Sequence, residues 1–453
     1  MKPTLPQGTR DFTAEVVRKR NYIFNVIRNV FELYGFEPLE TPAMENLDTL
    51  MGKYGEEGDK LIFKILNNGL DNPAKQQQAK EDFEKVLNGK SIKGITERAL
   101  RYDLTIPFAR YVAMNFGQLT MPFKRYQIQP VWRADRPQKG RYREFFQCDA
   151  DVVGSNSLLN EAELTSIYSE VFKKLGIDVE IRINSRKILA ALAEVCGRAD
   201  NMMNITISID KLDKIGMDKV KEELLQRGLN EDQITIIETY LNISGSNKEK
   251  LTELNKLIGN TETGKRGIKE IEFILGFLPS SVNSQLSADF TLARGLNYYT
   301  GIIFEIKAKG VQIGSIGGGG RYDDLTGLFG VANIPGLGIS FGVDRIYDVM
   351  EELWLFPEEV QMGTQVLFFN LGEAESKAAF NLMQQLRSRG IRCEIYHDNA
   401  KFDKQFKYAE KKATGYVVIV GSKELQEGTC VIKNLSTGQQ STIAAADISS
   451  YSF

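Results

Sequence analysis

The chain has 453 residues, a formal net charge of -2 and an ordinary globular composition with 42% apolar and 26% charged residues, and its length corresponds to about three domains. Its single histidine, His397, excludes His-rich zinc sites, HExxH metalloproteases and most acid–base schemes that depend on histidine. The four cysteines lie far apart in the sequence, so zinc ribbons and CxxC redox pairs are also excluded and a reducing compartment is expected.

The chain shows no targeting or membrane segment in its sequence. Residues 1–12 are polar and include two prolines, which is unlike a signal peptide. The longest dense apolar runs, such as the one at 416–420, have about six residues, far fewer than the roughly 20 that a membrane span needs. We therefore expect a cytoplasmic protein with no membrane segment.

The first predicted elements are a helix and a pair of strands. Apolar residues at helical spacing predict a helix over residues 14–34, and a short strand follows over 36–39. Residues 67–94 are polar and rich in Lys, Gln and Asn, which predicts an insertion or a mobile loop of open role. Aromatic and β-branched residues over 124–132 and 143–153 predict a hairpin whose strands are joined by a long charged loop.

The middle of the chain changes from helical to strand character. Leucine-rich amphipathic segments over residues 185–279 predict a mostly helical inserted module. Strands are predicted over 288–292 and 302–308, and a glycine-rich passage follows at 314–320. A strand after these glycines gives way to a helix near Asp344.

The last part of the chain alternates between strands and helices. The predicted strands cover 364–371, 391–396 and 416–420, the predicted helices cover 374–389 and 401–412, and a hairpin covers 430–443. This βαβαβ pattern predicts a small parallel or mixed sheet flanked by helices.

A basic segment stands out against the near-neutral chain. Between Lys124 and Arg143 there are seven basic residues and one acid, Asp135, a local charge of +6. Arginines on a loop are suited to bidentate contacts with a phosphate, and aromatic strands flank this loop. A charged loop that is merely solvated is the alternative.

Two glycine-containing segments are candidates for an anion site. Residues 314–322 contain a glycine run that allows a ligand to approach the backbone, but they match neither a Walker A loop nor a dinucleotide fingerprint, and a flexible loop remains equally open. Residues 336–345 end with Arg345 in the first turn of a helix, where a cation opposes the helix dipole. That unfavourable position indicates an anionic ligand, with a core strand followed by a surface arginine as the alternative.

Two further segments combine polar and aromatic residues. Residues 292–301 place Arg294 beside the adjacent tyrosines Tyr298 and Tyr299, which could enter a pocket or simply pack in the core. In residues 100–107, Asp103 or Thr105 precedes a helix and could either bind a ligand or act only as an N-cap.

Together these segments resemble the class II aminoacyl-tRNA synthetases. The helix before Gly35 with the strand up to Pro42 resembles motif 1, residues 124–151 resemble motif 2 with Arg133 as its arginine, and residues 336–345 resemble motif 3. Within the class, Arg-Gly-Leu-Asn-Tyr-Tyr at 294–299 and Pro-Gln-Gly-Thr-Arg-Asp at 6–11 resemble signatures of the histidyl-tRNA synthetase family. The resemblance covers essentially the whole chain.

The resemblance implies a fold and a division into domains. The expected fold is an α+β catalytic domain, an antiparallel sheet with flanking helices, with a helical insertion and a C-terminal α/β domain. The expected boundaries are 1–184 and 281–358 for the catalytic domain, 185–280 for the insertion and 359–453 for the anticodon-binding domain. A homodimer through the motif 1 region is also implied.

The resemblance further implies ATP-dependent activation of L-histidine to histidyl-adenylate and transfer of the histidyl group to tRNA(His), with Mg²⁺. Because the attacking carboxylate is already ionised, such a reaction needs charge neutralisation and alignment, which arginines and Mg²⁺ provide. By resemblance the catalytic residues are Arg133 and Arg294, and the ATP-binding residues are Arg133, Asp135, Arg141 and Arg345. The histidine-binding residues are Asp103, Leu104, Thr105, Arg133, Gln147, Asp151, Arg294, Tyr298, Tyr299 and Tyr322.

Neutral imidazole offers one donor and one acceptor, so a site with a carboxylate and a phenol would reject apolar analogues strongly. Asp151 and Tyr299 resemble that pair. For tRNA, the resemblance points to Gln138 and Lys139 in the charged loop and to Lys404 and Lys407 in the C-terminal domain; the metal ligands stay unassigned.

Two other functions remain open from the residues. One is a synthetase-like regulatory protein that partners an ATP phosphoribosyltransferase, and the other is a glycyl, prolyl or threonyl class II enzyme. The retained arginines Arg133, Arg294 and Arg345 and the C-terminal βαβαβ part favour an enzyme. The signature at 294–299 favours histidine as its substrate.

Overall fold

The computed structural model describes residues 2–90, 92–138, 140–293, 298–361 and 363–453, with the backbone alone for 55–57. It contains two compact units, one of Met1–Arg10 with Ile23–Leu355 and the other of Asp11–Tyr22 with Phe356–Phe453. Among the described residues, none of the helices has the length and apolar character that crossing a membrane requires. The domain boundaries expected from the sequence stay a prediction.

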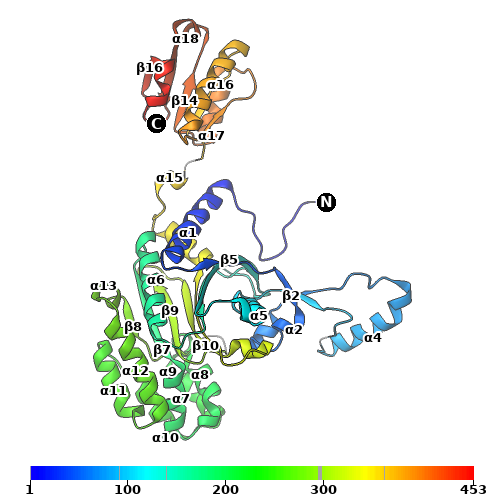
Figure 1. The fold of residues 1–453 in the computed structure, drawn as a ribbon, viewed down its shortest axis with the longest axis vertical. Coiled ribbons are helices and arrows are strands. Elements are labelled where there is room, and N and C mark those ends of the chain that lie inside the picture. Colours follow the sequence, from blue (N-terminus) through cyan, green and yellow to red (C-terminus); the bar gives the residue numbers. More distant parts are fainter. Residues whose placement is uncertain (1, 91, 139, 294–297, 362) are drawn as a thin grey trace. The chain divides into compact units, whose positions relative to one another are not determined.

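The first unit is built on a mixed sheet, which has eight strands in the described residues (Figure 1). In order across the sheet they are β1 (Glu37–Pro38), β5 (Phe123–Trp132), β6 (Glu144–Val153), β11 (Pro335–Gly342), β10 (Gly317–Asp323), β9 (Ile302–Ala308), β7 (Val179–Ser185) and β8 (Leu286–Ala288). The central pairs are antiparallel, as predicted, and the outermost pairs β1–β5 and β7–β8 are parallel.

The helices α1 (Ala14–Leu33) and α6 (Leu159–Leu175) bury apolar side chains against one face of this sheet. Tyr168 and Phe172 of α6 lie 4.8 and 5.5 Å from the ring of Phe341 on β11, and Phe31 of α1 lies 5.8 Å from the same ring. The predicted helix over 14–34 is confirmed. Gly35, with φ of +75°, ends it in the left-handed conformation that glycine adopts without a Cβ penalty.

Because successive side chains on a strand point to opposite faces, the residues that alternate with this apolar core face the other side of the sheet. On β6 these are Gln147, Asp149 and Asp151, and on β11 they include Gly338 and Ser340. The opposite face is therefore polar and carries the site.

The region predicted to be a helical insertion is helical. Its helices in the described residues are α7 (Arg186–Val195), α8 (Met202–Ile209), α9 (Leu212–Gln226), α10 (Glu231–Leu241), α11 (Asn247–Ile258), α12 (Glu262–Phe277) and α13 (Ser280–Asn283). Figure 1 shows them gathered beside β7 and β8. Capping boxes at Asn230 and Ser246 begin α10 and α11, since each side chain accepts a hydrogen bond from the backbone three residues ahead.

A second, smaller sheet lies between β1 and β5 in the sequence. It consists of β2 (Met44–Asn46), β4 (Arg98–Leu100) and β3 (Lys64–Ile65), in that order. The accompanying helices are α2 (Leu47–Leu50), α3 (Gly55–Lys60), α4 (Gln76–Leu87) and α5 (Thr105–Asn115), and α14 (Val343–Glu352) follows β11.

The second unit contains the predicted alternation of strands and helices. Its sheet has the order β13 (Cys393–Ile395), β12 (Val366–Phe368), β14 (Tyr416–Ile419), β15 (Thr429–Asn434) and β16 (Gln440–Ala444). The helices of its C-terminal part are α15 (Glu358–Gln361), α16 (Glu373–Ser388), α17 (Phe402–Lys411) and α18 (Ser422–Glu427). Parallel pairs around β12 and an antiparallel hairpin at β15–β16 confirm the mixed sheet.

Three local expectations differ from the structure. The polar stretch 67–94, predicted to be an insertion or a mobile loop, contains the twelve-residue helix α4, since charged and glutamine side chains suit a solvated helix. The glycine run is not a flexible loop, because Gly317–Asp323 forms strand β10 between β9 and β11. The strand expected at 288–292 is instead β8 (Leu286–Ala288), and the chain turns after it.

Candidate active site

Two adjoining cavities open on the polar face of the main sheet, both within the first unit. The outer cavity has a volume of about 550 Å³ and the inner one about 50 Å³. Four residues line both: Arg133, Gln147, Gly318 and Ser340. The two cavities therefore meet at the side chain of one arginine.

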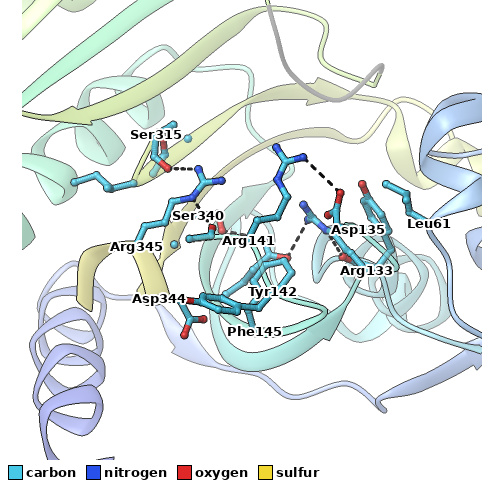
Figure 2. A pocket seen from close by; sticks show the side chains of 17 residues that line it. Leu61, Arg133, Asp135, Arg141, Tyr142, Phe145, Ser315, Ser340, Asp344 and Arg345 are labelled. Atoms are coloured by element: carbon cyan, nitrogen blue, oxygen red, sulfur yellow. Dashed lines mark hydrogen bonds and ion pairs between the residues drawn. The ribbon is translucent and has the colours of Figure 1, made fainter. Parts of the chain in front are cut away.

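The outer cavity is lined by arginines from different elements (Figure 2). Arg133 follows β5, Arg141 belongs to the charged loop, and Arg345 lies in the first turn of α14. Arg141 pairs loosely with Asp135 at 3.6 Å and is half exposed. Three cations that converge on one open cavity are suited to a polyanion such as a nucleotide phosphate chain.

Arg133 is held in a defined orientation at the junction. Its Nε donates to the carbonyl of Tyr102 at 3.0 Å, and its Nη2 donates to Oε1 of Gln147 at 3.4 Å. The guanidinium also lies 4.2 Å from the ring centroid of Tyr102 and 5.2 Å from that of Phe145. Nη1 donates no hydrogen bond to the described residues, so it is available to an anionic ligand.

The N-terminal segment buttresses the charged loop. Arg10 forms an ion pair with Asp344 at 2.5 Å and lies over the ring of Tyr142 at 3.2 Å. Arg345 donates to the carbonyls of Gly140 at 3.0 Å and Ser315 at 2.6 Å. Residues at both ends of the chain's first unit thus shape the wall of the outer cavity.

The inner cavity follows from the register of four strands. One row across the sheet reads Arg125, Asp151, Gly338 and Gly320, and the next reads Gln127, Asp149, Ser340 and Gly318. The β5 and β6 positions carry polar side chains, whereas most of those on β11 and β10 are glycines. The missing side chains leave room above the sheet, and the polar ones form the wall.

Asp151 sits in a buried ion pair on this wall. Its Oδ2 lies 2.8 Å from Nη2 of Arg125, and its Oδ1 accepts a hydrogen bond of 2.5 Å from the hydroxyl of Tyr322. Burial raises the pKa of the Asp151 carboxyl, while Arg125 and Tyr322 oppose that rise. Burial also raises the pKa of Asp149, its neighbour two residues away, to about 7. A buried, acceptor-rich wall of this kind is suited to a ligand with N–H donors or a positive charge.

Asp103, just before α5, lines the same inner cavity. Its Oδ1 accepts hydrogen bonds from the hydroxyl of Tyr54 at 3.0 Å and from the backbone of Ile106 at 3.1 Å, and its Oδ2 accepts from the hydroxyl of Tyr298 at 3.4 Å. Asp103 therefore bonds to the first turn of α5 from the position before its N-cap, Leu104, and lines the cavity at once. The two sequence-based alternatives for this residue are compatible, because the two carboxylate oxygens serve different partners.

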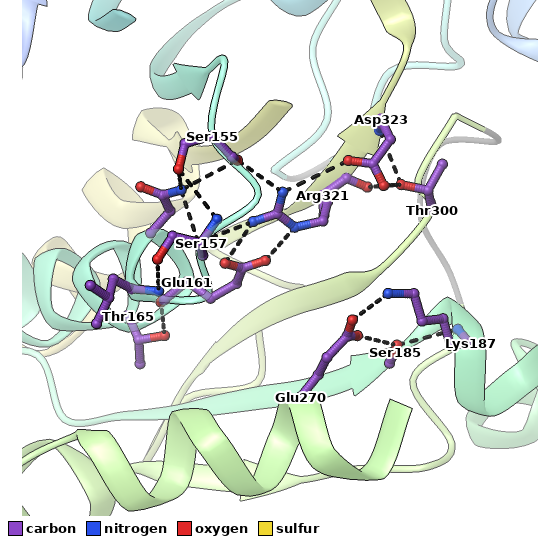
Figure 3. A network of polar contacts seen from close by, with 12 residues as sticks. Ser155, Ser157, Glu161, Thr165, Ser185, Lys187, Glu270, Thr300, Arg321 and Asp323 are labelled. Carbon is purple, nitrogen blue, oxygen red and sulfur yellow. Dashed lines mark hydrogen bonds and ion pairs between the residues drawn. The ribbon is translucent and has the colours of Figure 1, made fainter. Parts of the chain in front are cut away.

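The segment that carries Tyr298 and Tyr299 is held by a network beneath it (Figure 3). The backbone of Thr300 donates to the carbonyl of Arg321 at 2.8 Å, and its hydroxyl donates to Asp323 at 2.7 Å. Arg321 in turn makes a two-pronged ion pair with Glu161 of α6, at 2.5 and 2.8 Å. Both tyrosines line the inner cavity and also pack against the neighbouring apolar core, so the structure combines the two alternatives.

The structure brings most of the residues expected from the sequence to these cavities. Those that line the inner cavity are Asp103, Thr105, Arg133, Gln147, Asp151, Tyr298, Tyr299 and Tyr322, and those that line the outer cavity are Arg133, Asp135, Arg141 and Arg345. The side chain of Leu104 is buried, and its carbonyl accepts a hydrogen bond from Arg125 at 3.3 Å. Arg294 and Lys139 lie outside the described residues, and the roles of all these residues stay predictions.

Gln138 lies in an exposed turn, where its backbone pairs with that of Arg141. Lys404 and Lys407 lie on exposed positions of α17 in the second unit. None of the three lines a described cavity of the first unit.

The sequence reasoning missed two polar residues that line the inner cavity, Asp149 and Ser340, and also Arg125, the buried partner of Asp151. A signal was present, because polar residues occupy every second position of the otherwise apolar strands β5 and β6. Such a stripe inside a central hairpin indicates a polar face that is buried rather than solvated.

Comparison with known proteins agrees with this geometry. The family model described as "Histidyl-tRNA synthetase" matches residues 76–346, and the one described as "Anticodon binding domain" matches residues 365–451. The chain is 53% identical over 450 residues to a "Histidine--tRNA ligase" of Bacteroides fragilis, with 99% of this chain and 98% of the relative covered. It is 52% identical over 457 residues to the "Histidine--tRNA ligase" of Phocaeicola vulgatus, with 99% and 98% covered.

A solved structure is similar over the same length. The chain matches the crystal structure of histidyl-tRNA synthetase from Nostoc sp. PCC 7120 with a TM-score of 0.82 and 31% identity, covering 99% of this chain and 98% of that one. The match includes the sheet, the helical region and the C-terminal α/β domain, as expected from the sequence.

Proposed function

Since the chain belongs to the histidyl-tRNA synthetase family, it is a ligase that activates histidine with ATP and transfers it to tRNA, and we propose that the outer cavity binds ATP and the inner cavity binds histidine. The observation that carries this proposal is the junction, where Arg133, Gln147, Gly318 and Ser340 line both cavities. The carboxylate of a ligand bound in the inner cavity and a phosphate bound in the outer cavity would meet beside Arg133.

The reaction at this junction needs no general base. An oxygen of the histidine carboxylate attacks the α-phosphorus of ATP, the new O–P bond forms, and the bond to the bridging oxygen breaks to release pyrophosphate. Negative charge gathers on the phosphoryl oxygens in the transition state, and Arg133 neutralises it there. The contacts of Arg133 with Tyr102 and Gln147 hold it in place before the substrates arrive, which lowers the cost of alignment.

The other outer-cavity residues are assigned to the rest of ATP. Arg345 and Arg141 bind the β- and γ-phosphates, since they face the open part of the cavity. The ring of Phe145 lines the same cavity and offers a flat apolar surface for the adenine base.

The inner cavity is assigned to the amino acid. Asp103, Thr105 and Gln147 surround the α-ammonium group, and Asp151 and Tyr299 bind the two ring nitrogens of the imidazole. Support comes from the three buried carboxyl groups that line a cavity of about 50 Å³, those of Asp103, Asp149 and Asp151, which suit a small ligand with cationic and donor groups. An apolar side chain of similar size would leave these buried polar groups without partners.

The donor set of the outer cavity fits Mg²⁺ that arrives with ATP. Mg²⁺ in such sites is bound mainly by substrate phosphates, with one or two carboxylates from the protein. Asp135 and Asp344 line the outer cavity, and Asp344 already pairs with Arg10. In the described ranges no cluster of three acidic, His or Cys side chains could hold a metal unaided. Asp135 is the proposed protein ligand, because its ion pair with Arg141, at 3.6 Å, is looser than that of Asp344, and the ion would neutralise phosphate charge.

The tRNA is proposed to contact both units. Lys404 and Lys407 project from α17, whose apolar side contacts the residue after β12, with 4.8 Å between the rings of Phe406 and Phe369. They are therefore free to meet phosphates of the anticodon arm. Gln138, in the exposed turn at the rim of the outer cavity, would meet the acceptor end, where the terminal ribose hydroxyl attacks the adenylate carbonyl and AMP leaves.

A homodimer through the motif 1 region, α1 with β1, completes the proposed assembly. Leu33 at the end of α1 is 69% exposed, and β1 is the edge strand of the main sheet. An exposed apolar side chain beside an open sheet edge is a surface suited to pairing. Sedimentation of the wild-type protein and of Leu33→Glu tests this, with a shift from dimer to monomer expected.

A cytoplasmic location also belongs to the proposal. The four cysteines, all within the described residues, are buried free thiols and form no disulfide with one another. This state is typical of a reducing compartment.

Two matched variants test the division of substrates between the cavities. We expect Asp151→Asn to raise the KM for histidine at least tenfold in ATP–pyrophosphate exchange while the KM for ATP stays within twofold. Arg345→Gln should do the reverse. Equal effects of either variant on both KM values would contradict the assignment of separate cavities.

A further inference from the structure

A chain of hydrogen bonds runs through the wall that the two cavities share. Nη2 of Arg133 donates to Oε1 of Gln147 at 3.4 Å, and Nε2 of Gln147 donates to Oγ of Ser340 at 3.0 Å. Ser340 and Asp149 are direct partners in the register of β11 and β6, so their side chains lie on the same face of the sheet, and Ser340 favours the ionised form of Asp149. The chain thus links the arginine of the outer cavity to a carboxyl on the wall of the inner one.

The chemistry of these groups gives the chain a direction. The Ser340 oxygen already accepts from Gln147, and its hydroxyl has one proton to donate. An ionised Asp149 on the neighbouring strand is placed to accept a hydrogen bond from this hydroxyl, so that each group from Arg133 onward can donate to the next. The Gln147 amide then has to present its oxygen to Arg133, because its nitrogen is committed to Ser340.

Asp149 is placed to act as the end of this chain. It is 2% exposed, and its Oδ1 accepts no hydrogen bond from the described residues although it lines the inner cavity. Arg125, the nearby cation, already pairs with Asp151 at 2.8 Å. The need to neutralise Arg125 therefore does not by itself explain why Asp149 is buried beside Asp151.

We propose that Asp149 is a positioning residue that, through Ser340 and Gln147, holds the Arg133 guanidinium at the junction of the two cavities. This inference rests on the proposed function, because it takes the junction as the place where the histidine carboxylate meets ATP. It adds two residues, Asp149 and Ser340, to those expected from the sequence.

The charge of Asp149 decides how strongly the chain is anchored. Six charged or titratable side chains act on Asp149 or are acted on by it: Arg101 after β4, Arg125 of β5, Asp151 of β6, Asp103 before α5, Tyr299 of the segment after residue 297 and Tyr168 of α6. Burial is the largest effect and raises the pKa of Asp149 to about 7, while Arg125 and Ser340 favour the ionised form. Hydrogen bonds to an ionised acceptor are roughly twice as strong as neutral ones. The interaction between Ser340 and Asp149 is therefore expected to strengthen as the pH rises through 7.

The test compares Asp149→Asn, Ser340→Ala and the double variant in ATP–pyrophosphate exchange. Asn keeps the shape and an acceptor but cannot ionise, and Ala interrupts the chain. At pH 8 we expect kcat to fall five- to tenfold in each single variant, with the KM for histidine changed less than threefold. The double variant should be little worse than Ser340→Ala alone, because both changes break one chain.

The pH dependence supplies a readout that a purely structural role would not move. The ratio of kcat/KM between wild type and Asp149→Asn cancels the ionisation of histidine and ATP, since both enzymes use the same substrates. We expect this ratio to approach one below pH 6 and to reach its plateau above pH 8. A constant ratio across this range, or independent effects in the double variant, would overturn the proposal.

Two further variants keep the test informative if Ser340→Ala folds poorly. Ser340→Thr retains the hydroxyl and should retain most of the wild-type kcat. Cys148→Ala changes the residue between Gln147 and Asp149 but faces the apolar side of the sheet, opposite Phe341, and should leave kcat unchanged. A loss of kcat in Cys148→Ala equal to that in Asp149→Asn would mean that any disturbance of β6 lowers kcat. That result would count against the proposed hydrogen-bond chain.

The inference can fail separately from the proposed function. If Asp151→Asn and Arg345→Gln give the separate KM effects described above, the cavities are assigned correctly. Additive effects of Asp149→Asn and Ser340→Ala would then reject only the proposed role of Asp149 in positioning Arg133. If the KM effects of Asp151→Asn and Arg345→Gln are absent, the cavity assignment itself is rejected.

Discussion

Adding one methyl group at Gly338 should damage histidine binding more than any other part of the reaction. Gly338 lies opposite Asp151 in the sheet register. A Cβ built on it would lie 2.7 Å from Cγ of Asp151 and closer still to Oδ1, whereas ordinary contact begins at 3.4 Å. Backbone on both neighbouring strands prevents Gly338 from retreating, so the Asp151 side chain has to move by about 0.7 Å or more.

The size of the effect follows from what this movement breaks. Asp151 is 2.8 Å from Arg125 and 2.5 Å from the hydroxyl of Tyr322, and both contacts would lengthen toward or beyond the limit of a hydrogen bond. A hydrogen bond to a charged group contributes about 1.5–3 kcal/mol. Loss of the corresponding contact with imidazole should raise the KM for histidine roughly 10- to 100-fold, at 1.4 kcal/mol for each tenfold change.

ATP–pyrophosphate exchange at saturating ATP measures this KM, and circular dichroism confirms that Gly338→Ala is folded. Gly342→Ala is the matched control, because its added methyl on the same strand would meet no atom closer than 3.5 Å. Gly342 lines the outer cavity, so any effect of that variant should fall on the KM for ATP. A histidine KM within twofold of wild type in folded Gly338→Ala would refute the reasoning.

Replacing Arg321 by Met should lower the free energy of unfolding by about 3–5 kcal/mol in urea titrations, because its carboxylate partner on α6 is fully buried and would lose its counter-charge; a loss below 1 kcal/mol would contradict this. Burial raises the pKa of Asp149 to about 7, so between about pH 4 and pH 7 the folded chain retains a proton that the unfolded chain has released. The free energy of unfolding should therefore fall as the pH rises to 7, by at most roughly 1.4 kcal/mol per pH unit from this group. Unfolding of Asp149→Asn should lack that part of the slope, and an unchanged pH dependence would argue against a raised pKa. Lys404→Ala with Lys407→Ala should raise the KM for tRNA and reduce its salt dependence without changing pyrophosphate exchange. In the same domain, His397→Gln should leave both assays unchanged, and a loss of exchange activity would show that the domain influences activation.

Local patterns in the sequence predicted most of the elements correctly. Helix α1 follows from apolar residues at helical spacing and from the glycine that ends it, both of which act within a few residues. The hairpin β5–β6 follows in the same way from aromatic and β-branched runs. The helix within 67–94 was missed because the composition of this stretch is polar, although α4 carries apolar side chains at helical spacing, such as Phe83 and Leu87, which lie exposed.

The candidate site was predictable only where a motif marked it. The arginines Arg133 and Arg345 and the tyrosines after residue 297 stand in recognisable segments, whereas Asp149 and Arg125 are single polar residues within apolar strands. Their importance depends on neighbours on other strands, and the register between strands cannot be read from one strand alone. The glycines of β10 were likewise ambiguous, since a glycine run suits both a loop and a strand that borders a cavity.

By itself the sequence determined the class of fold, the order of elements, the family and the residue types available for catalysis, because these depend on periodicity, composition and contiguous motifs. Only the tertiary structure decided that the polar residues of β5 and β6 face a row of glycines on β10 and β11, so that two cavities meet at Arg133. The physical reason is that side chains alternate between the faces of a strand, and the pairing of distant strands determines which of them share a face.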